Sequence, residues 1–161
     1  VWTTIPAIII AILCIYSANV LSTIDEAKAD QTKVTVWAQQ FAWSYEYTSP
    51  SGKKFIDPYL WIKCTPTGSE TGQGAPCSGS QVAFDIKAVD VIHSFWVPAF
   101  AMKQDAVPGI TTHTKITPNR LGTYPVVCTE LCGIGHGIMR STVHVVTPAQ
   151  YAIWLKSHGT S

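Results

Sequence analysis

The sequence has 161 residues, of which 47% are hydrophobic and only 13% are charged, and its formal net charge is +1. This length suits one domain with a short appendage, and the hydrophobic residues are numerous enough to form a core. The low charge and the absence of a cluster of Lys and Arg argue against a nucleic-acid-binding surface, so we expect no nucleic-acid partner.

Residues 1–24 contain no charged side chain, and the run ends at Asp25 and Glu26. A helix needs about 20 mostly apolar residues to cross the hydrocarbon core of a bilayer. A secretory signal peptide is the alternative, but it starts with basic residues and has a shorter apolar stretch. We therefore expect a transmembrane helix over 1–24, with the lipid membrane as a partner, and a surface linker over 25–33. Because the chain opens on Val1 rather than Met, we also expect it to be truncated.

Segments that alternate between apolar and polar residues follow, which is the pattern of half-buried β-strands. The clearest is 81–88, in which the even-numbered residues are apolar and share one face. Several such segments separated by turns predict a mostly β fold, an antiparallel β-sandwich or barrel over 34–147. A capping-box pattern with Pro at the first helical position then predicts a short helix within 148–161. The other predicted strands are 33–39, 41–47, 59–62, 111–117, 123–127 and 139–146.

The segment from about 50 to 80 is irregular and is interpreted as an insertion into the sandwich. Within it, Cys64 and Cys77 flank a polar loop that is rich in Gly and Pro. A disulfide between them would close this loop, and it indicates an oxidising, extracytoplasmic location. A second metal site is the alternative, although no His or Met lies between the two cysteines.

The strongest functional motif combines two thiols, an imidazole and a thioether, with the spacing Cys-x3-Cys-x3-His-x2-Met. Soft sulfur ligands and imidazole suit copper, and a blue-copper site needs one Cys, two His and a weak axial Met. The additional thiolate in this motif would allow two copper ions to share one loop. His93, in an apolar run that ends a strand, is the best source of a second imidazole, and three glycines within the motif would allow a tight backbone. The motif residues are Cys128, Cys132, His136 and Met139.

Three other interpretations of this motif remain. Cys128 and Cys132 could form a disulfide. The two cysteines with His93 and His136 could form a closed tetrahedral zinc site, which would leave Met139 unused. The same residues could also be core residues with no metal. A copper site explains more of the motif than any of these.

The motif resembles subunit II of the haem-copper cytochrome c oxidases. The segment 97–109, the aromatic run 40–47 and the first seven residues resemble the same family, so matching blocks cover nearly the whole chain. The resemblance implies a cupredoxin-like domain on a membrane helix. It also implies an earlier membrane helix that is missing from this sequence.

Carried over residue by residue, the resemblance implies a binuclear copper centre of the copper A type. Its ligands would be His93, Cys128, Cys132, His136, Met139 and the backbone carbonyl of Glu130. The Glu130 side chain would help to bind a magnesium (or manganese) ion where this subunit meets the catalytic subunit, and a solvated loop carboxylate is the alternative. Side chains that bind a metal usually have hydrogen-bonded partners of their own. The polar candidates for this role that lie nearby in sequence are Asp90, Asp105 and Arg140.

The family often has a Trp where this chain has Phe41, and electrons from cytochrome c pass through that ring. Phe41 and Trp43 are therefore the aromatic candidates for electron uptake, although aromatic residues at alternate strand positions also serve as core.

The function implied is that of the electron-transfer subunit of a respiratory cytochrome c oxidase. Electrons would come from cytochrome c or a membrane-bound cytochrome and would pass to haem in catalytic subunit I, where oxygen is reduced to water and protons are pumped. Other oxidase subunits would be further partners, and the enzyme is the complex rather than this chain. The sequence has no Cys-x-x-Cys-His motif, so we expect no haem in this chain.

We expect the chain in the plasma (inner) membrane of a bacterium, with the copper domain on the extracytoplasmic side. The main alternative is a membrane-tethered copper carrier, in which few and exposed ligands would be expected. An electron-transfer domain of nitrous oxide reductase and a quinol oxidase subunit are less consistent with the membrane span and the paired cysteines, respectively.

Overall fold

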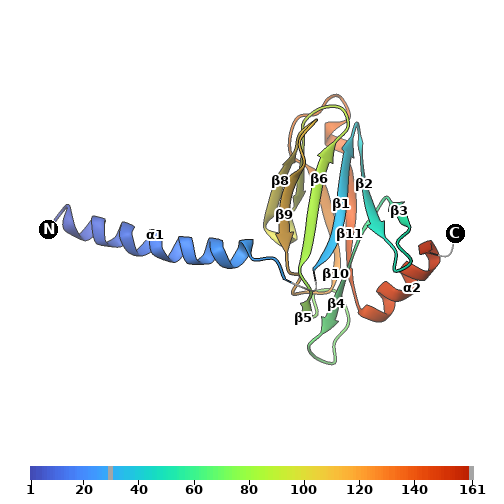
Figure 1. Cartoon of the computed structure of the whole chain (residues 1–161), viewed down its shortest axis with the longest axis horizontal. Helices are drawn as coiled ribbons and strands as arrows, with labels where there is room; N and C mark the ends of the chain where they lie inside the picture. The colour runs from blue at the N-terminus through green and yellow to red at the C-terminus, as the bar shows by residue number, and fades with distance from the viewer. Residues whose placement is uncertain (29–30, 160–161) are drawn as a thin grey trace.

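The computed structural model describes residues 1–28 and 31–159. Helix α1 (Thr4–Asp25) extends away from a β-sandwich, and helix α2 (Pro148–Gly159) packs against the side of the sandwich (Figure 1). Residues 29 and 30 of the expected linker lie outside the described residues, as do the last two residues of the tail.

The described residues form eleven strands and two short 3-10 helices in addition to α1 and α2. The strands are β1 (Thr32–Gln39), β2 (Ala42–Thr48), β3 (Lys54–Asp57), β4 (Leu60–Pro66), β5 (Cys77–Gly79), β6 (Val82–Ala88), β7 (His93–Val97), β8 (Met102–Ala106), β9 (Thr112–Ile116), β10 (Gly122–Cys128) and β11 (Arg140–Val146). The 3-10 helices are η1 (Pro98–Phe100) and η2 (His136–Ile138).

The strands form two sheets, in the orders β3-β2-β1-β6-β9 and β5-β4-β11-β10-β7-β8. The expected mostly β sandwich behind an apolar N-terminal helix is confirmed, and most strand pairs are antiparallel as expected, but two pairs are parallel. β1 pairs with β6 in parallel, and so does β11 with β4. Parallel neighbours need a long crossover connection, and here each connection contains strands of both sheets.

α1 is the one helix among the described residues that is long and apolar enough to cross a membrane, judged by length and composition. Its residues Thr4–Ile24 have a mean hydropathy of 2.2, and none of them is buried against the sandwich. Thr32 follows the described part of the linker and starts β1 at the adjacent end of the sandwich.

The core lies between the two sheets, where alternate residues of each strand face inward. In β6, Val82, Phe84 and Ile86 are buried as the alternation predicted, whereas Ala88 is only half-buried. α2 is held on the outside by Trp154, whose ring stacks on Trp61 with 5.4 Å between the ring centroids.

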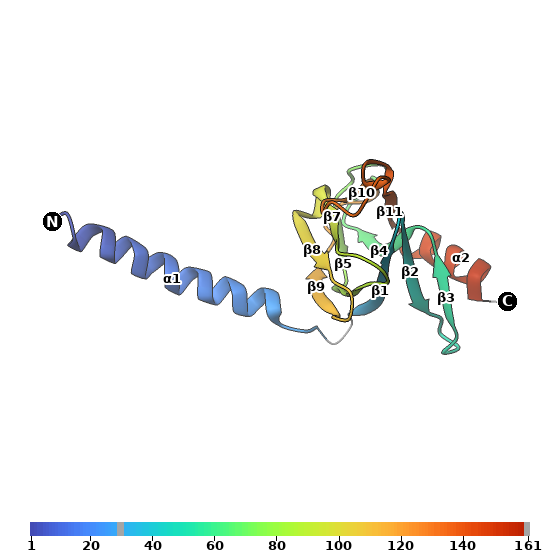
Figure 2. The same cartoon turned by 90° about the horizontal axis from the view of Figure 1, so that it is seen from above.

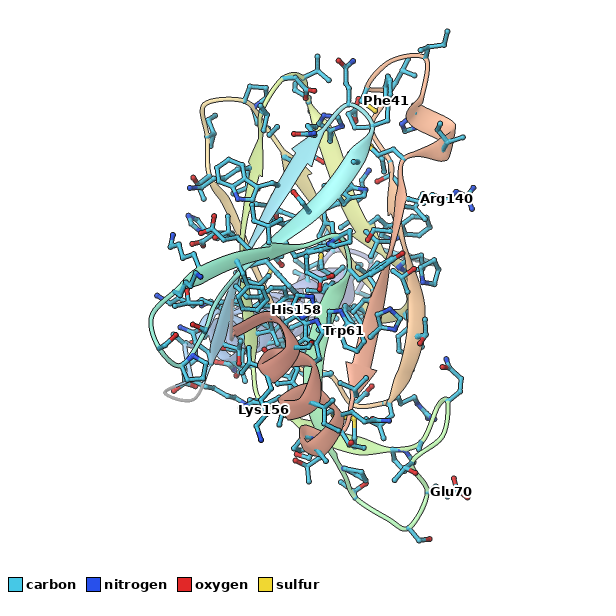
Figure 3. The ribbon with its side chains drawn as sticks, turned by 90° about the vertical axis from the view of Figure 1, so that its right-hand side faces the viewer. Phe41, Trp61, Glu70, Arg140, Lys156 and His158 are labelled. Atoms are coloured by element: carbon cyan, nitrogen blue, oxygen red, sulfur yellow. A yellow bond between two sulfur atoms is a disulfide. The ribbon has the colours of Figure 1, made fainter. Side chains whose placement is uncertain are left out.

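Strand directions place four loops at one end of the sandwich, opposite the end that α1 adjoins. β1 and the parallel strand β6 both end there, and β7 begins there because it follows β6 directly. β8 and β10 run antiparallel to β7, so they end at the same place. The four loops are 40–41, 89–92, 107–111 and 129–139. Figure 3 shows Phe41 at this end and Glu70, in the loop between β4 and β5, at the opposite end.

Candidate metal centre

The loop end brings the predicted ligands together from two parts of the chain, His93 and the segment 128–139. His93 begins β7 and Cys128 ends β10, and these strands are paired neighbours in which Cys128 lies opposite Phe95. The His93 Nδ1 atom lies 3.9 Å from Cys128 Sγ, and the Glu130 carbonyl oxygen lies 3.3 Å from the same sulfur. Figure 2 looks down on this end and shows the loop that joins β10 to β11 beside β7.

Cys132 contacts the two remaining predicted ligands, His136 and Met139. Its Sγ lies 3.7 Å from His136 Nδ1 and 3.8 Å from Met139 Sδ. The two thiol sulfurs, Cys128 Sγ and Cys132 Sγ, are 3.9 Å apart, and both cysteines are free. The structure therefore does not contain the disulfide that was one alternative reading of this motif.

These separations fit ligands of a common metal site. With a metal–sulfur distance of about 2.3 Å and a metal–nitrogen distance of about 2.0 Å, tetrahedral ligands lie about 3.5–3.8 Å apart. The ligand atoms of His93, Cys128 and Cys132 all lie within 4.8 Å of one another, and all three residues are buried. Met139 is fully buried as well, and only His136 is half-buried, at the surface.

The shape of the loop depends on two of its three glycines. Gly133 has a φ of +132°, in the region that favours glycine, and a Cβ there would lie 2.9 Å from the Gln40 amide nitrogen. At Gly135 a Cβ would lie 2.4 Å from the Phe41 ring. Gly137 has open space around it, so the expectation that all three glycines shape the loop was wrong for this one.

Asp90 orients the buried histidine. Its Oδ1 lies 2.8 Å from His93 Nε2, so that in the tautomer with a proton on Nε2 the other nitrogen, Nδ1, faces the thiols and is available to a metal. Backbone N–H groups of Gln40 and Val91 donate to the same carboxylate. Burial alone would raise the pKa of Asp90, but these hydrogen bonds outweigh it and lower the pKa to about 2. A carboxylate on the far nitrogen is the usual partner of a metal-binding histidine.

Gln40 is a residue of the site that the sequence did not indicate. Its side-chain Nε2 donates to the Cys132 carbonyl oxygen at 2.6 Å, and its backbone N–H donates to Asp90. It thereby joins the β1–β2 turn to the 89–92 loop and to the 129–139 loop, which is called the metal loop below because it carries most of the candidate ligands. The sequence feature that could have indicated Gln40 is its position directly after β1. That position places Gln40 beside the candidate ligands only when the parallel pairing of β1 with β6 is known.

The other two polar candidates have unequal roles. Asp105 accepts a hydrogen bond from the Ser94 hydroxyl at 2.7 Å, and the Ser94 carbonyl accepts one from Thr129 N–H, which fixes the start of the metal loop. Arg140 is exposed at the start of β11. Asp105 therefore supports the loop indirectly, through Ser94.

Both thiols of the candidate site are buried. Burial, together with the neighbouring Cys128, raises the pKa of the Cys132 thiol to about 11. Since metals bind thiolate, a metal ion must displace the proton from such a group, and this couples binding to pH.

The two aromatic candidates lie at different depths. Phe41 is half-buried at the tip of the β1–β2 turn, with its ring against Gly135. Trp43 is buried, with its ring edge-on to the His93 ring at a centroid distance of 6.2 Å. Glu130 is exposed, so its carboxylate is accessible while its carbonyl faces Cys128.

The second cysteine pair forms the expected disulfide, between Cys64 and Cys77. It lies at the opposite end of the sandwich from the metal loop. The hairpin that it closes packs against the β9–β10 turn, where Gly74 N–H donates to Leu121 O and Leu121 N–H donates to Ala75 O.

Comparison with known proteins shows which family the chain resembles. Residues 75–146 match the family model "Cytochrome C oxidase subunit II, periplasmic domain". A cytochrome c oxidase subunit 2 from Thermostichus vulcanus is 46% identical over 101 residues, which are 62% of this chain and 31% of that protein. One from Drosophila simulans is 30% identical over 170 residues, which are 99% of this chain and 72% of that protein. The chain spans between 31% and 66% of the length of the first three relatives.

Among solved structures, the periplasmic domain of subunit II (CoxB) of the Bradyrhizobium japonicum cytochrome oxidase superposes with a TM-score of 0.63 and 25% identity. The match covers 83% of this chain and 96% of that one. The sandwich is therefore of the cupredoxin-like kind that was expected. On its fold and on the extent of its similarity to full-length relatives, the chain belongs to the cytochrome c oxidase subunit II family.

Proposed function

We propose that this chain is the electron-transfer subunit of a respiratory cytochrome c oxidase and that its loop end binds two copper ions. The observation that carries the proposal is the number and chemistry of the donors around the two free thiols. Two thiols, two imidazoles, a thioether and a carbonyl oxygen surround one small space. The residues are His93, Cys128, Glu130 (through its carbonyl), Cys132, His136 and Met139.

Six donors are too many for one tetrahedral ion, which takes four. If both thiolates are shared, each of two ions receives two sulfurs, one imidazole and one weak ligand, and no donor is left over. A copper pair of this kind would take up and release one electron with little change at each ion. The zinc alternative uses four of the donors and leaves the buried Met139 and the Glu130 carbonyl without a role.

The chain's own residues would prepare this centre for fast electron transfer. The Asp90–His93 contact and the Gln40 hydrogen bond to the Cys132 carbonyl hold the ligands in place, which limits rearrangement between redox states. Burial of the other ligands would exclude water from the centre. Half-buried His136 would give electrons a short path between the centre and the surface. Electrons would come in near Phe41, which lies at the surface, while buried Trp43 packs beside His93.

The surface around the loops is suited to protein partners. Among the described residues that follow α1, ten large hydrophobic residues are exposed, and seven of them belong to the four loops at the end of the sandwich that holds the candidate ligands. Clusters of exposed apolar side chains mark interaction surfaces. These seven are Val89, Val91, Ile92, Ile110, Leu131, Ile134 and Ile138.

We assign this surface to the electron donor, cytochrome c or a membrane-bound cytochrome, and to the catalytic subunit. The catalytic subunit would hold the haem that receives the electrons, and it would reduce oxygen to water and pump protons. The exposed Glu130 carboxylate would bind a magnesium (or manganese) ion shared with that subunit. Further oxidase subunits would complete the enzyme, which is the complex and not this chain.

The proposed organisation is a membrane span over 1–24, a linker over 25–33, the copper domain over 34–147 with its insertion at about 50–80, and a closing helix and tail over 148–161. The Cys64–Cys77 disulfide supports an extracytoplasmic copper domain. We place the chain in the plasma (inner) membrane of a bacterium.

The test is an electron paramagnetic resonance spectrum of the oxidised, copper-loaded full chain in detergent, with copper counted per chain. We expect two copper ions and a seven-line hyperfine pattern, because one unpaired electron would be shared by two equivalent nuclei. Cys132→Ser should abolish this pattern. Cys14→Ser, which changes an exposed cysteine of α1, is the matched control and should leave it intact.

One copper ion with a four-line pattern, or a chain that binds zinc in preference to copper, would overturn the binuclear site. The same result would move the interpretation toward a copper carrier or a structural metal domain.

A further inference from the structure

A groove of about 770 Å³ lies where the end of α1 meets the sandwich, remote from the metal loop. The end of α1 is fixed there by buried Gln81, whose side chain accepts a hydrogen bond from Lys28 N–H and donates one to the Glu26 carbonyl. The helix, η1, the start of β8, the end of β9 and β10 all contribute to its walls. The side chains that matter are Ile24, Phe100, Lys103, Lys115, Arg120 and Tyr124.

The rim of this groove is basic. Lys103, Lys115 and Arg120 line it together with the hydroxyl groups of Thr114 and Thr117, and none of the described residues that line it is acidic. A second hollow of about 260 Å³ shares Ile24, Lys115 and Thr117 with the groove and adds Lys28. The cationic surface therefore continues toward the end of the helix.

Sheet pairing extends the same basic surface across the first sheet. Lys33 of β1 and Lys115 of β9 both lie opposite Ala83 of β6, so the three residues form one row across three strands. Neighbouring strands are about 4.8 Å apart, which places the two lysine backbones about 10 Å from each other. The two lysines thus flank β6 on the sheet that borders the groove.

The floor of the groove is apolar. The Phe100 and Tyr124 rings meet edge to face with 6.2 Å between their centroids, and Ile116 packs against the core beside them. Ile24, in the last turn of α1, completes the apolar part and is exposed to the groove. A ligand that fits must therefore carry both a negative charge and apolar chains.

We propose that this groove binds an anionic phospholipid, with the phosphate among Lys103, Lys115 and Arg120 and the acyl chains along α1. The proposal rests on the proposed membrane span, because only then does the end of α1 lie at the level of the lipid headgroups. A phosphate compound in solution would use the basic rim but would leave the apolar floor and Ile24 uncovered. Basic residues near an anionic bilayer surface each add about 1 kcal/mol to binding, about a five-fold change.

The experiment uses the full, copper-loaded chain in lipid nanodiscs that contain phosphatidylglycerol and phosphatidylcholine in equal amounts. Native mass spectrometry then measures the ratio of the two lipids that remain bound per chain. The test variant is Lys103→Gln with Arg120→Gln. The matched control is Lys54→Gln with Lys87→Gln, which removes the same charge on the outer face of the first sheet.

We expect the wild-type chain and the control to retain phosphatidylglycerol in preference to phosphatidylcholine. In the test variant the ratio of bound phosphatidylglycerol to bound phosphatidylcholine should fall about five-fold for each cation removed, about 25-fold together. Lys103→Gln alone should lower the ratio of bound phosphatidylglycerol to bound phosphatidylcholine about five-fold. Because Lys103 is exposed, this change does not disturb the core. It is the variant to use if the Arg120 change, which removes a hydrogen bond to the Gly74 carbonyl, prevents folding.

Equal retention of the two lipids by the wild type, or an unchanged preference in the test variants, would overturn the lipid site. In either case an intact copper spectrum would show that the proposed electron-transfer centre stands. A chain that does not enter the nanodiscs at all would overturn the membrane span, and the lipid site with it.

Discussion

The replacement of Asp90 by Ala tests how far this carboxylate supports copper binding and how far it supports the fold, because copper affinity and unfolding of the metal-free chain can be measured separately. The carboxylate accepts hydrogen bonds from His93 Nε2 at 2.8 Å and from the backbone N–H groups of Gln40 and Val91, each at 2.7 Å. The His93 side chain is 0% exposed, so removal of Asp90 leaves its N–H without a partner in the protein.

The structure sets the size of the effect. A buried donor without a partner costs about 1–3 kcal/mol, whereas the two backbone groups belong to exposed residues and can turn to water at little cost. Loss of the orienting partner of a metal-bound histidine lowers metal affinity by about 10–100-fold, which corresponds to about 1.4–2.7 kcal/mol. We therefore expect Asp90→Ala to lower the free energy of unfolding of the metal-free chain by about 1–3 kcal/mol. In the copper-loaded chain the weaker metal binding should lower it by about 1.4–2.7 kcal/mol more.

The chain offers a matched control in a second His–Asp pair with the same 2.8 Å separation. His113 and Asp85 lie on the outer face of the first sheet with 67% and 47% of their side chains exposed, and exposed pairs contribute about 0–1 kcal/mol. Asp85→Ala should therefore leave copper affinity unchanged. Copper titrations against a chelator and urea unfolding of the metal-free and loaded chains measure both effects. Equal copper affinities for Asp90→Ala and Asp85→Ala would refute the role assigned to Asp90.

Three further predictions concern the fold and the loop. Replacement of Cys64 and Cys77 by Ser should lower the free energy of unfolding by about 3 kcal/mol, the loop-closure value for their separation of 13 residues, and should leave the copper spectrum intact. Gly135→Ala should destabilise by about 1–3 kcal/mol and disturb the copper spectrum, because its Cβ would enter an aromatic ring, whereas Gly137→Ala should change neither. His144→Phe should reduce the loss of stability that urea unfolding detects as pH falls below 6.5. Burial lowers the pKa of His144 in the folded state, so the unfolded state takes up the proton first.

Each of these has an outcome that contradicts it. A disulfide-free chain of unchanged stability would show that the hairpin contributes nothing to the fold. Equal effects of alanine at the two glycines would show that the close approach at Gly135 does not matter. An unchanged pH profile after replacement of His144 would assign the acid sensitivity to other groups.

The ligand set could be predicted from the sequence because most of it is local. Cys128, Cys132, His136 and Met139 lie within one loop, where spacing alone restricts how far apart their side chains can lie. His93 could be added because the alternation of the preceding strand indicates where that strand ends. The disulfide was predictable for the same reason, since its two cysteines bound a segment that has no core of its own.

The supporting contacts could not be predicted in this way, because they depend on pairings between distant strands. Gln40 reaches Cys132 across 92 residues, and it does so only because β1 lies parallel to β6. Alternation of apolar residues identifies a strand and its inward face, but it contains no information about the direction of the neighbouring strand. The prediction of an antiparallel sandwich missed the two parallel pairs for that reason, and the role of Gln40 was missed with them.

The arrangement of the fold also explains why a loop with so little regular structure can hold ligands in a fixed geometry. The loop is attached at its start through Thr129 to Ser94, at its middle through Cys132 to Gln40, and at its end through the Cys128 N–H to Met139 carbonyl contact. These three attachments come from β7, the β1–β2 turn and β10, so a shift of the loop would disturb elements of both sheets. Precise ligand placement is therefore a property of the whole sandwich, and substitutions at Gln40 should affect the copper spectrum more than overall stability.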